Sequence, residues 1–277
     1  MKTLLLTGAT GLIGTNFLKT MPSDVFVFGI GKEDNVAMYP MADYIIHAGG
    51  YGQPAKFMAD ELATICVNTK TTLELLRKLK PDGKFLFIST SEVYSGAEPP
   101  YKETDIGTTT PTHPRACYIE SKRCGETICM AYRRMGYDVK IARLCLAYGA
   151  TRKGDARVLN QLIEHGMDGK IQLLDKGNSV RTYCYVEDAV GMMWDILLYG
   201  TQPLYNVGGY SKTTIAGLAR KIGKILGAEV FLGKENKEDA PEEVSVDVSL
   251  YEKEFGKREL VDLETGLKKT IRCYIEH

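Results

Sequence analysis

The sequence feature that most constrains the fold is a glycine-rich turn, TGATGLIG, at residues 7–14. It follows a short apolar run that predicts a strand, and it precedes a helical pattern of apolar residues. Glycines spaced G-x-x-G-x-x-G permit a tight turn that brings the backbone close to a pyrophosphate, and the next helix offers free N–H groups. The turn therefore predicts a dinucleotide-binding site. Its expected residues are Gly8, Thr10, Gly11, Leu12, Ile13 and Gly14.

Strand and helix patterns alternate along the first 150 residues. Apolar runs predict strands at residues 4–6, 25–28, 44–46, 84–88 and 139–144. Helical spacing predicts a long helix over 61–79 and another over 116–135, which Gly136 ends. This alternation predicts an α/β fold with a doubly wound parallel sheet.

The pattern becomes less regular after about residue 150. We expect a nucleotide-binding domain formed by residues 1–150, to which residues 183–207 return. Residues 151–182 and 208–277 are then expected to form a smaller mixed α/β lobe that binds the substrate.

The charge balance argues against two classes of partner. Lysine plus arginine and aspartate plus glutamate both number 35, so the chain has no net field suited to nucleic acid or to an anionic membrane surface. The apolar runs are too short for a signal peptide or a membrane span. Seven cysteines without a C-x-x-C pair argue against zinc and against a disulfide framework. We expect a cytoplasmic protein without a metal.

A cluster of polar residues, STSE, directly follows the strand predicted at 84–88. Buried strands of α/β proteins are apolar because both faces are covered, whereas the carboxyl ends of the strands bind ligands. Thr90, Ser91 and Glu92 are therefore candidates to act on a substrate.

Tyr118 and Lys122 lie four residues apart on the helix predicted at 116–135, so their side chains share one face. A phenol with a pKa near 10 is a poor base at neutral pH. A neighbouring ammonium and a cationic nicotinamide ring would both lower that pKa. Tyr118 is then expected to take a proton from a sugar or alcohol hydroxyl, with Thr90 sharing the same hydroxyl.

Together these motifs resemble an extended short-chain dehydrogenase/reductase. The segments that carry the resemblance are TGATGLIG, STSEVYSG, YIESK, VRTYCYVEDAV and LYNVGG. More narrowly, the chain is similar to the nucleotide-sugar epimerase/dehydratase family, which implies a Rossmann-like fold.

The resemblance also implies a chemistry. A bound NAD transiently oxidises C4 of a nucleotide-diphosphate sugar, and epimerisation, dehydration or decarboxylation follows from the ketone. Tyr118 is then the base, Lys122 its partner that also contacts the cofactor, and Thr90 the hydroxyl helper. Arg181 matches an arginine that holds the diphosphate, and Asn68 matches a helix asparagine of the family, although a surface role fits it equally. The family also implies a homodimer.

Among the members of this family, the segment around Glu92 most resembles UDP-glucuronate decarboxylases. Dehydratases carry Thr-Asp-Glu here, and Ser91 is too weak an acid to replace that aspartate. Arg115 and Arg157 lie in segments that resemble the substrate-binding helices of the decarboxylases. Two features depart from them: Leu146 occupies an asparagine position, and EVSVDVSL replaces a segment that contains an arginine.

Several alternatives remain open from the sequence. A C4 or C5 epimerase needs only the hydroxyl, Tyr118 and Lys122, and leaves Glu92 as a bystander. A 4,6-dehydratase, an NADPH-dependent 4-ketoreductase and a non-catalytic dinucleotide sensor are weaker fits. The acidic residue that would hold the adenosine ribose is missing from the end of the second strand, and Lys32 there would suit the extra phosphate of NADP.

Overall fold

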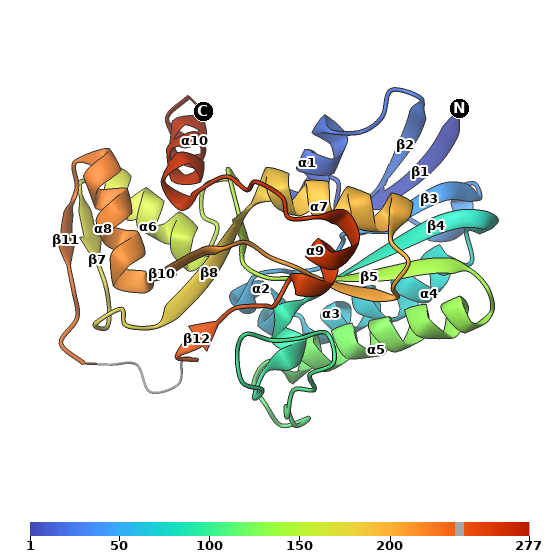
Figure 1. Cartoon of the computed structure of the whole chain (residues 1–277), viewed down its shortest axis with the longest axis horizontal. Helices are drawn as coiled ribbons and strands as arrows, with labels where there is room; N and C mark the ends of the chain where they lie inside the picture. Colours follow the sequence, from blue (N-terminus) through green and yellow to red (C-terminus); the bar gives the residue numbers. More distant parts are fainter. Residues whose placement is uncertain (236–240, 277) are drawn as a thin grey trace.

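Six parallel strands form the central sheet of the computed structural model, which describes residues 1–235 and 241–276 (Figure 1). In spatial order they are β2 (Val25–Ile30), β1 (Lys2–Thr7), β3 (Ala42–His47), β4 (Leu79–Thr90), β5 (Asp138–Leu144) and β9 (Leu204–Val207). The predicted Rossmann-like doubly wound sheet is therefore confirmed. All five strands predicted in the first 150 residues are present, each longer than expected; β4 has 12 residues where the sequence predicts 84–88.

Helices cover both faces of this sheet (Figure 1). On one face lie α1 (Leu12–Lys19) and α7 (Val186–Tyr199), and on the other lie α3 (Glu61–Asn68), α4 (Lys70–Leu76) and α5 (Ala116–Arg134). Leu4 and Leu6 point into the first layer of apolar residues, and Leu5 points into the second. This burial on both faces explains why the strands read as continuous apolar runs.

The long helix predicted over 61–79 is wrong. Helix α3 ends at Asn68, α4 runs from Lys70 to Leu76, and β4 already begins at Leu79. Between the helices, the hydroxyl of Thr69 donates to the carbonyl oxygen of Ile65 at 2.7 Å. Side-chain bonds of this kind compete with regular helix geometry, which apolar spacing does not reveal.

Helix α2 (Pro54–Ala59) packs against α3 and α5, and most of the remaining elements lie beyond the carboxyl ends of the sheet (Figure 1). A second sheet contains β10 (Ser211–Thr214), β8 (Val180–Tyr185) and β12 (Glu243–Val244), and β6 (Ala147–Tyr148) also pairs with β8. A two-stranded sheet joins β7 (Lys170–Gln172) to β11 (Glu229–Phe231). The nearby helices are α6 (Val158–Met167), α8 (Ile215–Leu226), α9 (Ser249–Phe255) and α10 (Leu263–Glu276). Strand β9 returns to the central sheet, while the residue boundaries between domain and lobe stay a prediction.

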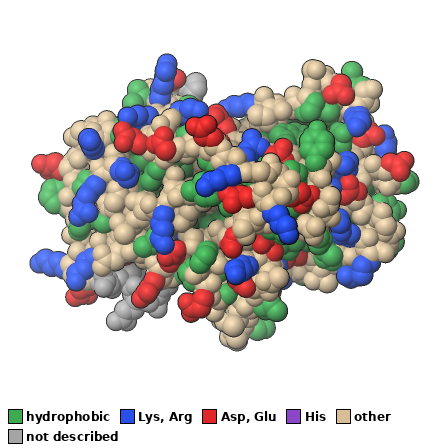
Figure 2. Space-filling view, viewed as in Figure 1, with side chains coloured by type: hydrophobic (Ala, Val, Ile, Leu, Met, Phe, Trp, Pro, Cys, Tyr) green, Lys and Arg blue, Asp and Glu red, His purple; other side chains and the backbone are tan. Residues whose placement is uncertain are grey.

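Lysine, arginine, aspartate and glutamate are interspersed over the face shown in Figure 2. Within the described residues, no helix has the length and apolar character required to cross a membrane. The same part of the chain holds no group of three histidine, cysteine or acidic side chains arranged for a metal ion.

A buried ion pair joins β5 to α5 under the carboxyl end of the sheet. Arg143 donates to both carboxylate oxygens of Glu126, at 3.0 and 2.8 Å, and the hydroxyl of Ser89 on β4 donates to the same carboxylate at 2.5 Å. The side chains of Arg143 and Glu126 are only 12% and 9% exposed. The guanidinium also lies over the ring of Tyr94, 4.7 Å from its centroid.

A buried histidine ties the glycine turn to β3. His47 is fully buried at the end of β3, and its Nδ1 lies 2.7 Å from the Thr7 hydroxyl, which also accepts a bond from the Gly49 N–H. Its Nε2 lies 3.0 Å from the carbonyl oxygen of Val67. A neutral ring satisfies all of these contacts when Nε2 carries the proton and Nδ1 accepts from Thr7. Burial and, to a smaller extent, the positive charge of Lys122 lower the pKa of His47 from 6.5 to about 3.

This pKa predicts a loss of stability in acid. Between pH 6.5 and about 3 the unfolded chain binds a proton on His47 that the folded chain excludes, so stability falls as pH falls, by up to about 1.4 kcal/mol per pH unit. A His47→Gln variant should be less stable near neutral pH and should lose less on acidification. Urea unfolding between about pH 7.5 and pH 5 measures both effects. An exposed histidine on α6, changed as His165→Gln, is the control, and equal acid losses in His47→Gln and the unchanged protein would contradict the assignment.

Candidate active site

The candidate site lies at the carboxyl edge of the central sheet, where β1, β3, β4 and β5 end. The glycine turn follows β1; Thr90 is the last residue of β4, and Ser91 and Glu92 follow it. Helix α5 carries Tyr118 and Lys122 past the same edge. The predicted cluster is therefore assembled from segments that are far apart in the sequence.

The glycine turn has the shape that a pyrophosphate cradle requires. Gly8 has a φ of +68°, and a Cβ atom on it would lie 2.5 Å from the carbonyl oxygen of Ala48. A Cβ on Gly14 would overlap the carbonyl oxygen of Gly8. Gly11 caps α1, so the free N–H groups of Leu12 and Ile13 stand at the helix start. These residues fit a dinucleotide, as the sequence predicted; Thr10 lies exposed in the same turn.

Lys32 lies two residues after the end of β2. The Lys32 ammonium lies 5.6 Å from the centroid of the Tyr51 ring. Asp34 is engaged by the Gly31 N–H and by the Tyr39 hydroxyl, each at 2.7 Å. The carboxylate of Asp34 is thus occupied by its own loop.

Tyr118 is buried between a hydrophobic ring and the polar strand end. Its ring stacks on Phe57 at 4.5 Å with an interplanar angle of 4°. Burial raises the pKa of Tyr118, the negative charge of Glu92 raises it further, and a hydrogen bond with the Thr90 side chain opposes the shift. The expected proximity of Thr90 and Tyr118 is therefore present. The contact with Phe57 could not be predicted from the sequence, because nothing in the segment PAKFMAD distinguishes a phenylalanine that stacks on Tyr118 from an ordinary core residue.

Lys122 places its ammonium between α5 and β4. Its ammonium donates to the carbonyl oxygen of Ile88 at 2.7 Å and lies 4.7 Å from the centroid of the Phe87 ring. Burial lowers the pKa of Lys122 to about 8, whereas Glu126 opposes the shift. The carbonyl oxygen of Ile88 holds the ammonium against β4, and an effect of this ammonium on the pKa of Tyr118 stays a prediction.

Asn68 is fully buried, so the surface alternative considered for it is wrong. Its amide nitrogen donates to the hydroxyl of Ser121 at 2.9 Å, which ties α3 to α5. Ser121 in turn donates to the carbonyl oxygen of Tyr118 at 3.1 Å. The asparagine therefore supports the turn of α5 that carries the tyrosine.

Glu92 forms an ion pair with Arg115 beside Tyr118. Glu92 Oε1 lies 3.1 Å from Arg115 Nη1, and the side chains are 28% and 43% exposed. The second carboxylate oxygen, Oε2, is buried without a hydrogen-bond partner within the described part of the chain. The Glu92 backbone N–H donates to the Thr90 hydroxyl at 3.2 Å, so Glu92 contacts both Thr90 and Arg115.

Ser91 and Arg181 meet around a thiol that the sequence analysis missed. Cys145 follows β5 and is 1% exposed. Burial raises its pKa to about 11, while a hydrogen bond with the Ser91 side chain and the charge of Arg181 act in the opposite direction. Arg181 donates to the carbonyl oxygens of Val180 and Pro241, at 2.7 and 3.0 Å. Burial lowers the pKa of Arg181, and the positive charge of Arg115 adds to that shift. Cys145 could not be identified from the sequence, because a cysteine in the apolar segment RLCLAYG looks like an ordinary core residue.

Two further predicted features have a different outcome. Arg157 caps α6, and its guanidinium makes a two-pronged contact with Asp155, with Nε–Oδ1 and Nη2–Oδ2 distances of 3.0 and 2.5 Å. The structure therefore commits this side chain to its own loop. Leu146 has a φ of +42°, a backbone conformation that suits asparagine better than leucine. The chain keeps the backbone of the asparagine position without its polar side chain.

The chain matches the model of the NAD-dependent epimerase/dehydratase family over residues 4–208. Its relatives include UDP-glucuronic acid decarboxylase 1 of Xenopus tropicalis, 29% identical over 100% of this chain and 73% of the relative. Another is UDP-glucuronic acid decarboxylase 6 of Arabidopsis thaliana, 29% identical over 95% of this chain and 86% of the relative.

Solved structures of similar fold include two epimerases. UDP-glucose 4-epimerase of Thermotoga maritima has a TM-score of 0.86 at 22% identity, covering 99% of both chains. UDP-glucuronic acid 4-epimerase of Bacillus cereus, solved with UDP-glucuronic acid and NAD, has a TM-score of 0.81 at 22% identity and also covers 99% of both chains. At this identity the likeness shows the fold.

Proposed function

The chain belongs to the NAD-dependent epimerase/dehydratase family, and from this premise we propose that it decarboxylates UDP-glucuronate through transient oxidation at C4 of the sugar. The observation that carries this proposal is the Glu92–Arg115 ion pair beside Thr90 and Tyr118. It sets a guanidinium next to the proton-transfer groups, where a substrate carboxylate can meet it. The relatives named as decarboxylases support the same substrate.

Tyr118 and Thr90 carry the proton transfer in this proposal. Tyr118 takes the proton of the C4 hydroxyl, and Thr90 shares a hydrogen bond with the same oxygen. Bound NAD supplies the hydride acceptor for this oxidation and later the hydride donor. Lys122, fixed by the Ile88 carbonyl oxygen, places a positive charge between α5 and β4, close to His47.

Ketone formation at C4 makes the carboxylate on C5 that of a β-keto acid. The bond between C5 and the carboxyl carbon then breaks, carbon dioxide leaves, and the electron pair passes into the enolate of the C4 ketone. C5 next takes up a proton, and reduction of the ketone returns the C4 hydroxyl. We assign Arg115 to hold the carboxylate before it leaves, because the guanidinium of Arg157 is committed to Asp155.

A second candidate function is C4 epimerisation of the same nucleotide sugar. The segment EVSVDVSL supports it, since it lacks the arginine that decarboxylases have there. This segment begins with Glu243 on β12. The carboxylate of Glu243 accepts hydrogen bonds from Lys212 and from the Ser245 hydroxyl. The two candidates differ in their product, so one assay separates them.

We predict carbon dioxide release and a UDP-pentose when the purified protein is incubated with UDP-glucuronate. Tyr118→Phe should lower the rate by about 10²–10⁴-fold, because it removes the proton-transfer group. It should leave bound NAD in place, since the cradle is formed by the glycine turn. Tyr137→Phe, near the other end of α5, is the matched control. An isomeric UDP-uronate with no carbon dioxide would reject decarboxylation in favour of epimerisation.

The Glu92→Gln variant tests whether Glu92 is a bystander. Its negative charge raises the pKa of Tyr118, so its removal lowers that pKa and should move the alkaline-rising limb of the rate to lower pH. The control is Glu120→Gln, which removes an exposed carboxylate paired with Arg123 on the same helix. Rates measured across pH in both variants decide the matter; an unchanged profile in Glu92→Gln would make Glu92 a bystander.

We also propose a homodimer formed through α3 and α5, which pack against each other within the chain. Leu62 and Ile65 share the outer side of α3 and are 77% and 38% exposed, an unusual position for two large apolar side chains on neighbouring turns. Ile128 and Met130 contribute less than expected from the sequence, because they pack partly against the core.

Sedimentation at micromolar concentration should therefore show a dimer. Leu62→Glu places a charge in the proposed interface and should shift the protein to monomers. Ile106→Glu introduces the same charge at a position that is 83% exposed and outside these helices, so it should leave the dimer intact. A monomeric unchanged protein would refute the proposal.

A further inference from the structure

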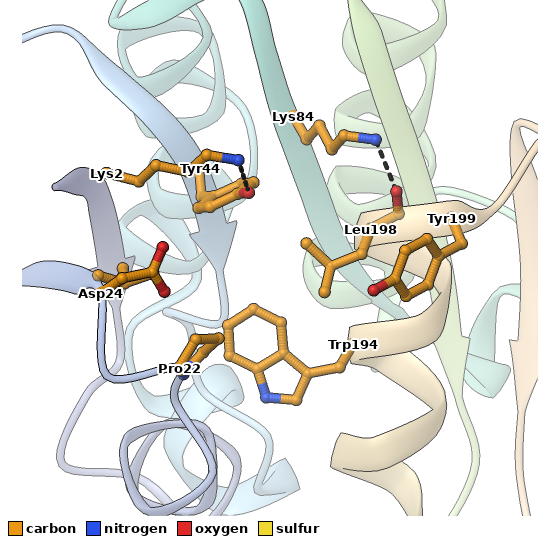
Figure 3. A pocket seen from close by; sticks show the side chains of 9 residues that line it. Lys2, Pro22, Asp24, Tyr44, Lys84, Trp194, Leu198 and Tyr199 are labelled. Atoms are coloured by element: carbon orange, nitrogen blue, oxygen red, sulfur yellow. Dashed lines mark hydrogen bonds between the residues drawn. The ribbon is translucent and has the colours of Figure 1, made fainter.

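A second hollow lies at the opposite edge of the central sheet from the candidate active site (Figure 3). It is lined by the amino-terminal parts of β1 to β4 and by the last turns of α7. Its volume is about 310 Å³, at the small end of the range of roughly 300–1,000 Å³ for small-molecule sites. A single ring with one substituent matches this size, whereas a dinucleotide does not.

Two ammonium groups stand on either side of this hollow (Figure 3). Lys2 donates to the Tyr44 hydroxyl at 2.6 Å. Lys84 donates to the carbonyl oxygen of Leu198 at 2.6 Å, near the end of α7, and lies 3.4 Å from the carboxylate of Asp138. Each ammonium has three N–H donors, so both retain donors for a further acceptor.

The indole of Trp194 forms a fixed wall between them. Its Nε1 donates to the Thr20 hydroxyl at 3.0 Å, and the ring packs edge to face on Phe17 with centroids 5.1 Å apart. These contacts hold the indole from the side of α1, and the rest of its ring lines the hollow (Figure 3). Aromatic rings pack favourably on such a surface.

The charges of the lining select the sign of the ligand. Lys2 and Lys84 contribute two positive charges, and Asp24 contributes one negative charge. Asp138 lies beside Lys84 but also pairs with Lys140 at 2.5 Å, so the balance stays positive. We propose that this hollow binds a small monocyclic aromatic anion, whose ring packs on Trp194 and whose carboxylate or phosphate accepts from Lys2 and Lys84. This site is separate from the proposed reaction and does not depend on it.

The chain offers a direct readout, because Trp194 is its only tryptophan. Titration of the full-length protein with benzoate, and separately with phenyl phosphate, should give a saturable change in tryptophan emission. Benzyl alcohol keeps the ring without the charge, and acetate keeps the charge without the ring; both should bind at least about tenfold more weakly. Absence of a saturable change with both anions, or equal binding of benzyl alcohol, would overturn the proposal.

Charge variants test the orientation of the ligand. Lys2→Met and Lys84→Met should each weaken binding of the anion about tenfold, and Asp24→Asn should strengthen it. Lys80→Met is the matched control on β4, since that ammonium pairs with Asp43 at 2.9 Å. Thermal unfolding of each variant verifies that it is folded. Unchanged binding in both lysine variants, weaker binding in Asp24→Asn, or displacement of benzoate by UDP-glucuronate would reject the site.

Discussion

The ion pair between Arg143 and Glu126 is the interaction on which the candidate site depends. It joins β5 to α5, and Ser89 adds β4 through the same carboxylate. These three elements carry or directly precede Thr90, Ser91, Tyr118, Lys122 and Cys145. Removing water from two charges carries a large desolvation penalty, which only a complete set of partners offsets. The geometry of the strand ends and of the helix is therefore fixed together or lost together.

The same network reaches three further segments of the chain. Arg143 also donates to the carbonyl oxygen of Glu103 at 3.2 Å, and the Glu103 side chain accepts from the Asn206 N–H at 2.8 Å. Asn206 accepts from the Tyr94 hydroxyl and donates to the carbonyl oxygens of Tyr101 and Asp247. The loop after Glu92, β9 and the segment after β12 are thus anchored on one buried charge pair. A fully satisfied network of this kind specifies one arrangement of its elements.

The features that the sequence predicted well are those with a local physical signature. The glycine turn, the strands and the polar residues after β4 follow from residue spacing and from the burial of both sheet faces. The features that it missed depend on distant residues. His47 follows an apolar run just as Ser89 and Thr90 do. Only the fold shows that its two ring nitrogens bond to the Thr7 hydroxyl and to the Val67 carbonyl oxygen. The break at Thr69 and the capture of Lys122 by Ile88 likewise depend on contacts that periodicity does not encode.

The protonation of the two helix residues links catalysis to assembly of the complete site. Burial raises the pKa of Tyr118 and lowers that of Lys122 to about 8, so in both cases the protein environment favours the uncharged form. Glu92 makes the tyrosine still harder to ionise, and Thr90 alone opposes it. In the proposed reaction, Tyr118 would therefore become a base only when further positive charge arrives beside it. A substrate carboxylate that draws Arg115 away from Glu92 would leave Glu92 unpaired, and its charge would then make ionisation of Tyr118 harder. A substrate carboxylate that shares Arg115 with Glu92 would not have this effect. The exposure of the Arg115 side chain, 43%, leaves its free nitrogens available for that shared arrangement.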